Sequence, residues 1–231
     1  MCLVLFYFHK GTAYMIVATM GLIGAGKSTL TNMLREKHGY TTFMEPTSES
    51  EGASDNPFLE DYYKNPRRWA FTMQAFLLFE RYKQFQEAHY RSLRGETCIL
   101  DSTYYSDFAF ALVQRDDGYF TEKEFDAYVS MHSALQPNLV YPDLIVYLDL
   151  SPNDTLERIR KRSRDCESSI PIEYLRHLYN AYQKILSALE RRCKVVRIDA
   201  RDNPETVLHK VELAIADTEK ELILNGHPCY K

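Results

Sequence analysis

The residues best suited to chemistry form a glycine-rich run near one end of the chain, GLIGAGKS at positions 21–28. The run fits the pattern G-x-x-x-x-G-K-[ST], with an apolar segment before it and a helix-like segment after it. Glycines let the backbone wrap round phosphates with its N–H groups turned inward, and a helix N-terminus adds partial positive charge. Lysine then reaches the outer phosphates, and the serine hydroxyl binds magnesium. The run predicts a nucleotide site made of Gly21, Gly24, Ala25, Gly26, Lys27, Ser28 and Thr29.

A second concentration of charge lies much further along the chain. Five cations fall within seven residues: Arg158, Arg160, Lys161, Arg162 and Arg164. A solvated helix face normally mixes charge signs, and no acid interrupts this group. Such density suits a lid that closes over triphosphate, where arginines stabilise the phosphoryl group in transfer. The alternative is a basic helix end that complements the helix dipole.

Carboxylates follow two of the strand-like segments. Glu45 comes after the segment 40–44, and Asp101 ends the segment CILD at 98–101, six residues before Asp107. In an open α/β sheet the carboxyl ends of strands usually meet the ligand. A carboxylate at Glu45 can accept the proton of an attacking hydroxyl group. The alternatives are a surface turn at Glu45 and a helix cap at Asp101 or Ser102.

The elements that must position these residues alternate between strand and helix. The strand-like runs lie at 14–20, 40–44, 97–100, 143–150 and 195–199. The helical patterns lie between and after them, at 27–37, 67–91, 107–113, 122–135, 154–161, 172–191 and 204–224. Alternation of this kind requires a parallel sheet that is covered on both faces. The sequence predicts a three-layer α/β/α fold of the P-loop NTPase type, with a five-stranded parallel sheet and an arginine-rich lid.

Composition limits the remaining possibilities. A net charge of −4 argues against a nucleic-acid polymer as partner, and no apolar run is long enough for a membrane helix. Five scattered cysteines favour a reducing compartment, and we expect a cytoplasmic protein. Residues 1–14 are expected to be an extension of uncertain role, and residues 15–231 one domain.

Taken together, the motifs resemble the deoxynucleoside kinase family, which includes deoxycytidine, deoxyguanosine and bacterial deoxyadenosine kinases. The resemblance runs from about Met15 to Ala200. It rests on GLIGAGKST at 21–29, Glu45-Pro46, NPFLEDYYKNPRRWAFTMQ at 56–74, DSTYYSD at 101–107 and RIRKRSRDCESSIPIEYL at 158–175. It implies transfer of the γ-phosphate of ATP to a nucleoside 5′-hydroxyl group, with Mg²⁺ as cofactor and a homodimer formed through the 67–91 helix and the helix after Asp107.

The resemblance also implies a role for individual residues. Glu45 matches the general base, Gln74 the glutamine that pairs with the base edge, and Arg81 and Asp107 the pair around the base. Tyr63 and Glu167 match the pair that holds the sugar 3′-hydroxyl group, Asp101 the acid that helps to place magnesium, and Arg158, Arg162 and Arg164 the lid arginines. Gln74 and Arg81 lie two helical turns apart on one face, and Phe71 and Leu78 complete a stripe that can line a slot for a flat base.

Ser102 departs from the family pattern, which places an arginine directly after the strand-end acid. Serine replaces neither the charge of arginine nor its bidentate geometry. One hypothesis is that Arg160, an added cation in the lid, partly compensates. The other is that the enzyme is slow or prefers an unusual phosphoryl acceptor.

These features predict a deoxynucleoside kinase of nucleotide salvage. The set Gln74, Arg81 and Asp107 argues against thymidine, and the NPFLEDYY stretch favours deoxyadenosine or deoxyguanosine, with deoxycytidine next. One alternative is a nucleoside monophosphate kinase of the thymidylate kinase kind, which would need a cationic site for the acceptor phosphate. Another is a catalytically weakened nucleotide-binding regulator, which Ser102 favours and the intact Glu45 and Lys27 oppose.

Overall fold

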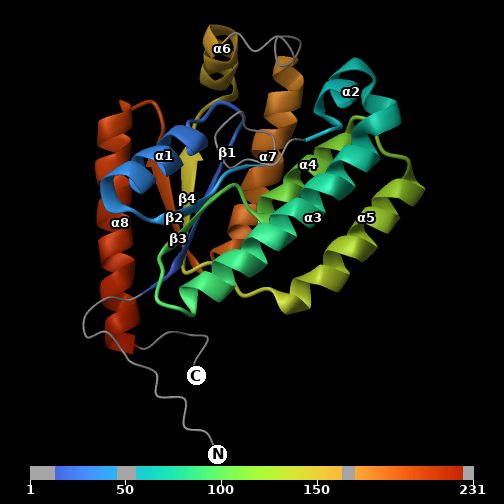
Figure 1. Cartoon of the computed structure of the whole chain (residues 1–231). Helices are drawn as coiled ribbons and strands as arrows, with labels where there is room; N and C mark the ends of the chain where they lie inside the picture. Colours follow the sequence, from blue (N-terminus) through green and yellow to red (C-terminus); the bar gives the residue numbers. More distant parts are fainter. Residues whose placement is uncertain (1–13, 46–55, 163–169, 226–231) are drawn as a thin grey trace, which may run out of the picture.

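The centre of the fold is one parallel sheet. The computed structural model describes residues 14–45, 56–162 and 170–225. Within these residues five strands lie in the order β2 (Thr41–Phe43), β3 (Cys98–Asp101), β1 (Ile16–Gly21), β4 (Leu144–Asp149) and β5 (Lys194–Asp199), and all pairs are parallel. The predicted three-layer architecture is confirmed (Figure 1).

Both faces of the sheet are buried, which explains why the central strands read as continuous apolar runs. In β1, Ile16, Ala18 and Met20 pack into the core under one face, and Val17 packs into the core under the other. Every residue of β1 is buried. The strand that leads into the phosphate loop is therefore fixed from both sides.

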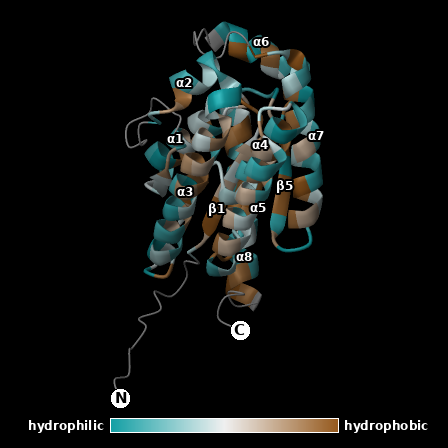
Figure 2. Ribbon diagram, turned by 90° about the vertical axis from the view of Figure 1, so that its right-hand side faces the viewer, coloured by the Kyte–Doolittle hydropathy of each residue, from teal (hydrophilic) through white to brown (hydrophobic). Residues whose placement is uncertain are grey.

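The helices form the two outer layers. One layer holds α1 (Lys27–His38) and α8 (Pro204–Asn225), and the opposite layer holds α3 (Pro66–Ser92), α4 (Tyr104–Asp116) and α7 (Ile172–Leu189) (Figure 1). The helix α5 (Glu122–Leu135) packs outside α3 and α4. The short helices α2 (Leu59–Lys64) and α6 (Pro152–Arg162) lie at one end of the molecule, and a 3₁₀ turn covers Gln136–Asn138. Figure 2 shows the apolar strands inside and hydrophilic residues along the outer helices. None of the described helices has the length and apolar composition that a membrane crossing requires.

The predicted elements occur with small shifts, but two were missed and one cap was wrong. The helix α2 and the 3₁₀ turn had no counterpart in the prediction. The helix α4 begins at Tyr104 rather than near Asp107, because Thr103 is its N-cap: the Thr103 side chain accepts from the Ser106 N–H, and the Ser106 hydroxyl accepts from the Thr103 N–H. The alternative of a cap at Asp101 or Ser102 is therefore corrected.

Gly21 joins β1 to the phosphate loop in a conformation that excludes other residues. Its φ is +153°, and a Cβ atom there would lie 2.8 Å from the backbone carbonyl oxygen of Leu148 in β4. Because that oxygen belongs to a sheet strand, it has little room to move. Gly118 provides a contrast, since its φ is +71° but a Cβ atom would have nothing within 4 Å.

We expect Gly21→Ala to lower the free energy of unfolding by about 2–4 kcal/mol, because strain and a backbone clash add together. Gly118→Ala, the matched control, should cost about 1 kcal/mol from the positive φ alone. Urea unfolding followed by circular dichroism measures both values. Equal losses for the two variants would show that the clash with Leu148 is relieved at no cost.

Candidate active site

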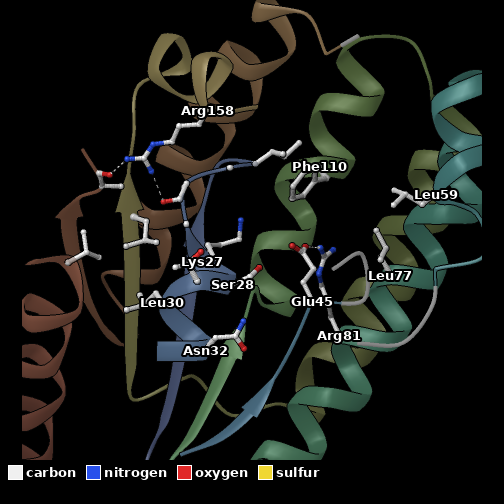
Figure 3. A pocket seen from close by; sticks show the side chains of 18 of the residues that line it. Lys27, Ser28, Leu30, Asn32, Glu45, Leu59, Leu77, Arg81, Phe110 and Arg158 are labelled. Atoms are coloured by element: carbon white, nitrogen blue, oxygen red, sulfur yellow. Dashed lines mark hydrogen bonds and ion pairs between the residues drawn. The ribbon is translucent and has the colours of Figure 1, made fainter. Parts of the chain in front are cut away.

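A cavity of about 560 Å³ opens at the carboxyl edge of the sheet. It extends from the phosphate loop and α1, past Glu45, to the facing sides of α3 and α4 (Figure 3). The loop after β5 and the start of α8 close the other end through Ala200, Asp202 and Pro204. The cavity therefore connects the predicted nucleotide site to the predicted base slot, as a transfer between two bound molecules requires.

The phosphate loop has the shape that its sequence predicts. Gly24 and Gly26 take positive φ values of +78° and +103°, and α1 starts directly after Gly26. The Lys27 ammonium group is buried against the loop and donates to the carbonyl oxygens of Gly21 at 3.1 Å and Leu22 at 3.2 Å. The first turn of α1 carries no acidic side chain. The helix itself thus adds no negative charge where phosphate would bind.

Glu45 lies between the phosphate loop and the base slot. Figure 3 shows its carboxylate between Lys27 and Ser28 on one side and Arg81 on the other. The Arg81 Nη2 atom donates to Glu45 Oε1 at 2.5 Å. Burial raises the pKa of Glu45, but the charges of Arg81 and Lys27 and hydrogen bonds from Arg81 and Ser102 outweigh it, so the pKa is below its ordinary value. Glu45 is therefore an ionised acceptor at neutral pH.

Asp101, at the end of β3, is the second buried carboxylate. Its side chain is 1% exposed, and neither carboxylate oxygen has a hydrogen-bond partner. Burial first, and then the charge of Glu45, raise its pKa to about 6, although Lys27 and the nearby Ser28 hydroxyl oppose the rise. Two unpartnered oxygens beside a hydroxyl group suit a hard cation, which prefers oxygen ligands. The described residues contain no group of three His, Cys, Asp or Glu for a metal, so such a cation would need further ligands from phosphate and water.

The base slot is lined by α3 and α4, but not by the predicted stripe. Gln74 and Arg81 line the cavity, as their spacing predicts. Leu77 lies between them along α3 and Met73 directly precedes Gln74, and both line the cavity. Leu78 is instead buried in the core, and Phe71 does not line the cavity. The prediction that Phe71 and Leu78 complete the stripe was wrong. Phe110 of α4 faces the slot from the other side, with its ring centroid 5.8 Å from the Arg81 guanidinium carbon.

Asp107 lies behind the slot rather than in its wall. It is fully buried and does not line the cavity. Its Oδ1 atom accepts from Arg81, and its Oδ2 atom accepts from the Tyr128 hydroxyl group at 2.5 Å. Asp107 therefore holds Arg81 through its Nη1 atom, and Glu45 holds it through its Nη2 atom.

Two glutamines extend this network. The Gln74 Nε2 atom donates to the Asp107 backbone carbonyl at 3.2 Å, and the Gln114 Nε2 atom donates to Gln74 Oε1 at 2.9 Å. Sequence reasoning missed Gln114 and Tyr128. One signal was available for Gln114, because it follows Asp107 by seven residues, the same two-turn spacing that separates Gln74 from Arg81.

The remaining predicted residues are described only in part. Tyr63 lines the cavity together with Tyr62 and Tyr174. Arg164 and Glu167 lie outside the described residues, as does the side chain of Arg162. Arg158 donates to the carbonyl oxygen of Ala25 at 3.2 Å and to that of Ala200, so it joins the phosphate loop to the loop after β5 (Figure 3).

Ser102 is buried at the turn between β3 and α4. Its φ is +82°, the one positive value at a non-glycine residue in the described part of the chain. Its hydroxyl oxygen lies 2.9 Å from that of Ser106. Arg160 is exposed and does not line the cavity. The hypothesis that Arg160 compensates for the missing arginine stays a prediction.

This fold and site define a phosphoryl-transfer enzyme of the P-loop class, because a phosphate loop, an ionised carboxylate and a slot for an acceptor share one cavity. A family model for deoxynucleoside kinase matches residues 17–224. The chain belongs to the deoxynucleoside kinase family and is a kinase, as the resemblance predicted.

Relatives and solved structures agree with this assignment. A deoxyadenosine kinase of Dictyostelium discoideum is 37% identical over 79% of this chain and 71% of its own length. A deoxyguanosine kinase of Bacillus subtilis is 32% identical over 90% of this chain and 97% of its own length. The structure of a deoxyadenosine kinase from M. mycoides with the products dCMP and dCDP matches with a TM-score of 0.76 at 28% identity, covering 88% of this chain and all of that one. The same kinase has also been solved with dATP.

The raised pKa of Asp101 predicts a pH-dependent cost to folding. The pKa of Asp101 is about 6 in the folded protein and 3.8 in the unfolded chain. Below pH 3.8 the carboxyl group is neutral in both states, and the full stability is present. As pH rises through 6 the buried group must ionise, so the free energy of unfolding falls. Asp101→Asn stays neutral, so its free energy of unfolding should exceed that of the wild type by about 1–3 kcal/mol more at pH 8 than at pH 4.

Chemical denaturation of both proteins at pH 4, 6 and 8, without nucleotide or magnesium, measures this difference. Asp126→Asn on the exposed surface of α5 is the matched control and should follow the wild type at each pH. An Asp101→Asn curve parallel to that of the wild type would show that Asp101 has an ordinary pKa.

Proposed function

We propose that this kinase transfers the γ-phosphate of ATP to the 5′-hydroxyl group of a deoxynucleoside in nucleotide salvage. Deoxyadenosine and deoxyguanosine are the favoured acceptors, and deoxycytidine is the next. The observation that carries the proposal is the position of Glu45, an ionised carboxylate between the phosphate loop and Arg81 of the base slot.

Glu45 is the general base of the proposed reaction. It accepts the proton of the 5′-hydroxyl group while that oxygen bonds to the γ-phosphorus, and the bond from the γ-phosphorus to the β–γ bridging oxygen breaks to release ADP. Arg81 holds Glu45 in one orientation through a buried ion pair, so the base needs little reorganisation. Its lowered pKa keeps Glu45 unprotonated at neutral pH.

The donor triphosphate binds at the opposite end of the cavity. The loop amides of Gly24, Ala25 and Gly26, the Lys27 ammonium group and Thr29 hold the phosphates in this proposal. Ser28 and Asp101 would hold a magnesium ion, which would supply positive charge to neutralise the phosphates. The lid arginines Arg158, Arg162 and Arg164 complete the cationic surroundings of the group in transfer.

The acceptor nucleoside binds between α3 and α4 in this proposal. Gln74 and Arg81 meet the base, and Tyr63 with Glu167 holds the sugar 3′-hydroxyl group. Asp107 acts on the base through Arg81. The names of the relatives support a purine acceptor, and the dCMP in the M. mycoides kinase supports deoxycytidine as a further one.

We further propose that the kinase is a cytoplasmic homodimer that pairs through α3 and α4. Support comes from α3, where Phe79 and Tyr90 are large apolar side chains, each 55% exposed. They lie eleven residues apart, which is close to three helical turns and puts them on one face.

The activity is tested with the four deoxynucleosides, ATP and magnesium, measuring kcat/KM for each. We expect phosphorylation of deoxyadenosine, deoxyguanosine and deoxycytidine and little of thymidine. Phosphorylation of deoxynucleoside monophosphates alone would overturn the proposal in favour of the monophosphate kinase alternative. Absence of transfer to any acceptor would favour the regulator.

Glu45→Gln should lower kcat about 100- to 10,000-fold, because it removes the proton acceptor while keeping the shape of the side chain. Glu36→Gln on the exposed face of α1 is the control and should leave kcat unchanged. Circular dichroism checks that both variants fold. A Glu45→Gln enzyme with wild-type kcat would exclude Glu45 as the base.

A further inference from the structure

The end of β2 lies beyond the hydrogen-bonded part of the sheet. β2 is an edge strand that pairs with β3 alone in the described part of the chain, and its last paired residue is Phe43, opposite Leu100. The Thr41 N–H group donates to the Thr97 carbonyl oxygen at 3.1 Å, so the backbone groups of Thr41 face β3. Because these groups alternate in direction along a strand, those of Met44 face away from the sheet. β3 therefore offers the Met44 carbonyl oxygen no donor.

Helix α3 supplies that donor. The Gln84 Nε2 atom donates to the Met44 carbonyl oxygen at 2.8 Å, in a partly buried position. A carbonyl oxygen only accepts, so the Gln84 amide must present its N–H side to it. Arg81 precedes Gln84 by three residues, which places the two side chains next to each other on one helix face. One face of α3 thus binds both the backbone just before Glu45 and the Glu45 carboxylate.

The two contacts hold opposite ends of the residue that accepts the proton in the proposed reaction. Arg81 binds one carboxylate oxygen, Glu45 Oε1. That contact alone would let the backbone move around the bound oxygen, because several rotatable bonds separate them, and the other oxygen would change direction. The Met44 carbonyl belongs to the planar peptide group that ends at the Glu45 nitrogen. Gln84 therefore fixes the backbone end of Glu45, while Arg81 fixes the carboxylate end.

We propose that Gln84 is a positioning residue for phosphoryl transfer, which holds the peptide group before Glu45 and so orients the carboxylate toward the acceptor hydroxyl group. The proposal rests on the proposed function and deepens it, because it adds a residue that acts only through Glu45. Neither Gln84 nor Met44 lines the cavity, so neither contacts a substrate bound there. A displacement of about 1 Å near the reacting groups can lower the rate about 100-fold. Loss of the Gln84 contact should therefore lower kcat and leave substrate binding nearly unchanged.

Two substitutions of similar volume test whether the hydrogen bond carries the effect. Gln84→Met removes the donor, and we expect kcat to fall about 10- to 100-fold, with KM for the deoxynucleoside and for ATP within about threefold of the wild type. Gln84→Lys restores an N–H donor, so its kcat should exceed that of Gln84→Met by about fivefold or more. Initial rates with ATP and magnesium give both constants. Equal losses in the two variants, or a loss expressed in KM, would overturn the proposal.

Gln86→Met is the matched control on the same helix. Gln86 also donates to a backbone carbonyl oxygen, that of Asn138, at 2.8 Å and outside the cavity. Its kcat should equal that of the wild type, because its partner does not adjoin Glu45. A loss of kcat as large as that of Gln84→Met would show a general weakening of α3 and would overturn the proposal.

A double-mutant cycle with Glu45→Gln separates an effect through Glu45 from a loss of structure. Without the base there is nothing to orient, so Gln84→Met should lower the residual kcat of Glu45→Gln by less than about twofold. The same loss in both backgrounds would overturn the proposal while Glu45 remained the base. Failure of the wild type to phosphorylate any deoxynucleoside, or a fully active Glu45→Gln enzyme, would instead count against the proposed function.

Discussion

The site depends on one buried cation shared by two carboxylates. The Arg81 side chain is 3% exposed and forms ion pairs with Glu45 and Asp107, which come from the end of β2 and from α4. Burial opposes its charge, yet the two carboxylates raise its pKa above the ordinary value. Loss of one partner of a buried pair leaves an uncompensated charge, which is strongly destabilising. The ion pairs therefore fix the position of Glu45 relative to α3 and α4, which line the cavity.

The same electrostatics give two neighbouring carboxylates opposite properties. Glu45 has Arg81 and Lys27 beside it, and its pKa is lowered. Asp101 is more deeply buried, lacks hydrogen bonds and faces the charge of Glu45, so its pKa is raised to about 6. Ionised Asp101 is therefore costly in the free enzyme, and a bound cation would remove that cost. Asp101 therefore lowers the stability of the free enzyme while it suits a bound cation, a trade-off that is common at functional sites.

The sequence predicted the sheet because strands buried on both faces read as apolar runs, and it predicted the phosphate loop because glycine spacing is specific. It predicted that Gln74 and Arg81 share a face, since helical periodicity gives direction. The family resemblance implied that Asp107 lies at the base, but the structure places it behind Arg81 and outside the cavity wall, because resemblance and periodicity do not give the depth of a side chain. Leu77 rather than Leu78 lines the slot because α3 packs against several elements, and apolar residues occur all round it. For Gln114 the seven-residue spacing from Asp107 was the available signal, because its side-chain partner, the Gln74 amide, is distant in the sequence.

The turn between Asp101 and Asp107 shows how these constraints meet at Ser102. A positive φ costs a non-glycine residue about 1 kcal/mol or more, so the surrounding structure must impose it. The Thr103–Ser106 capping box fixes the start of α4 directly after this residue. The short Ser102 side chain then lies beside Ser106 and adds a hydrogen bond that lowers the pKa of Glu45. Serine thus supports the ionised state of Glu45 without adding the positive charge that an arginine would bring to this turn.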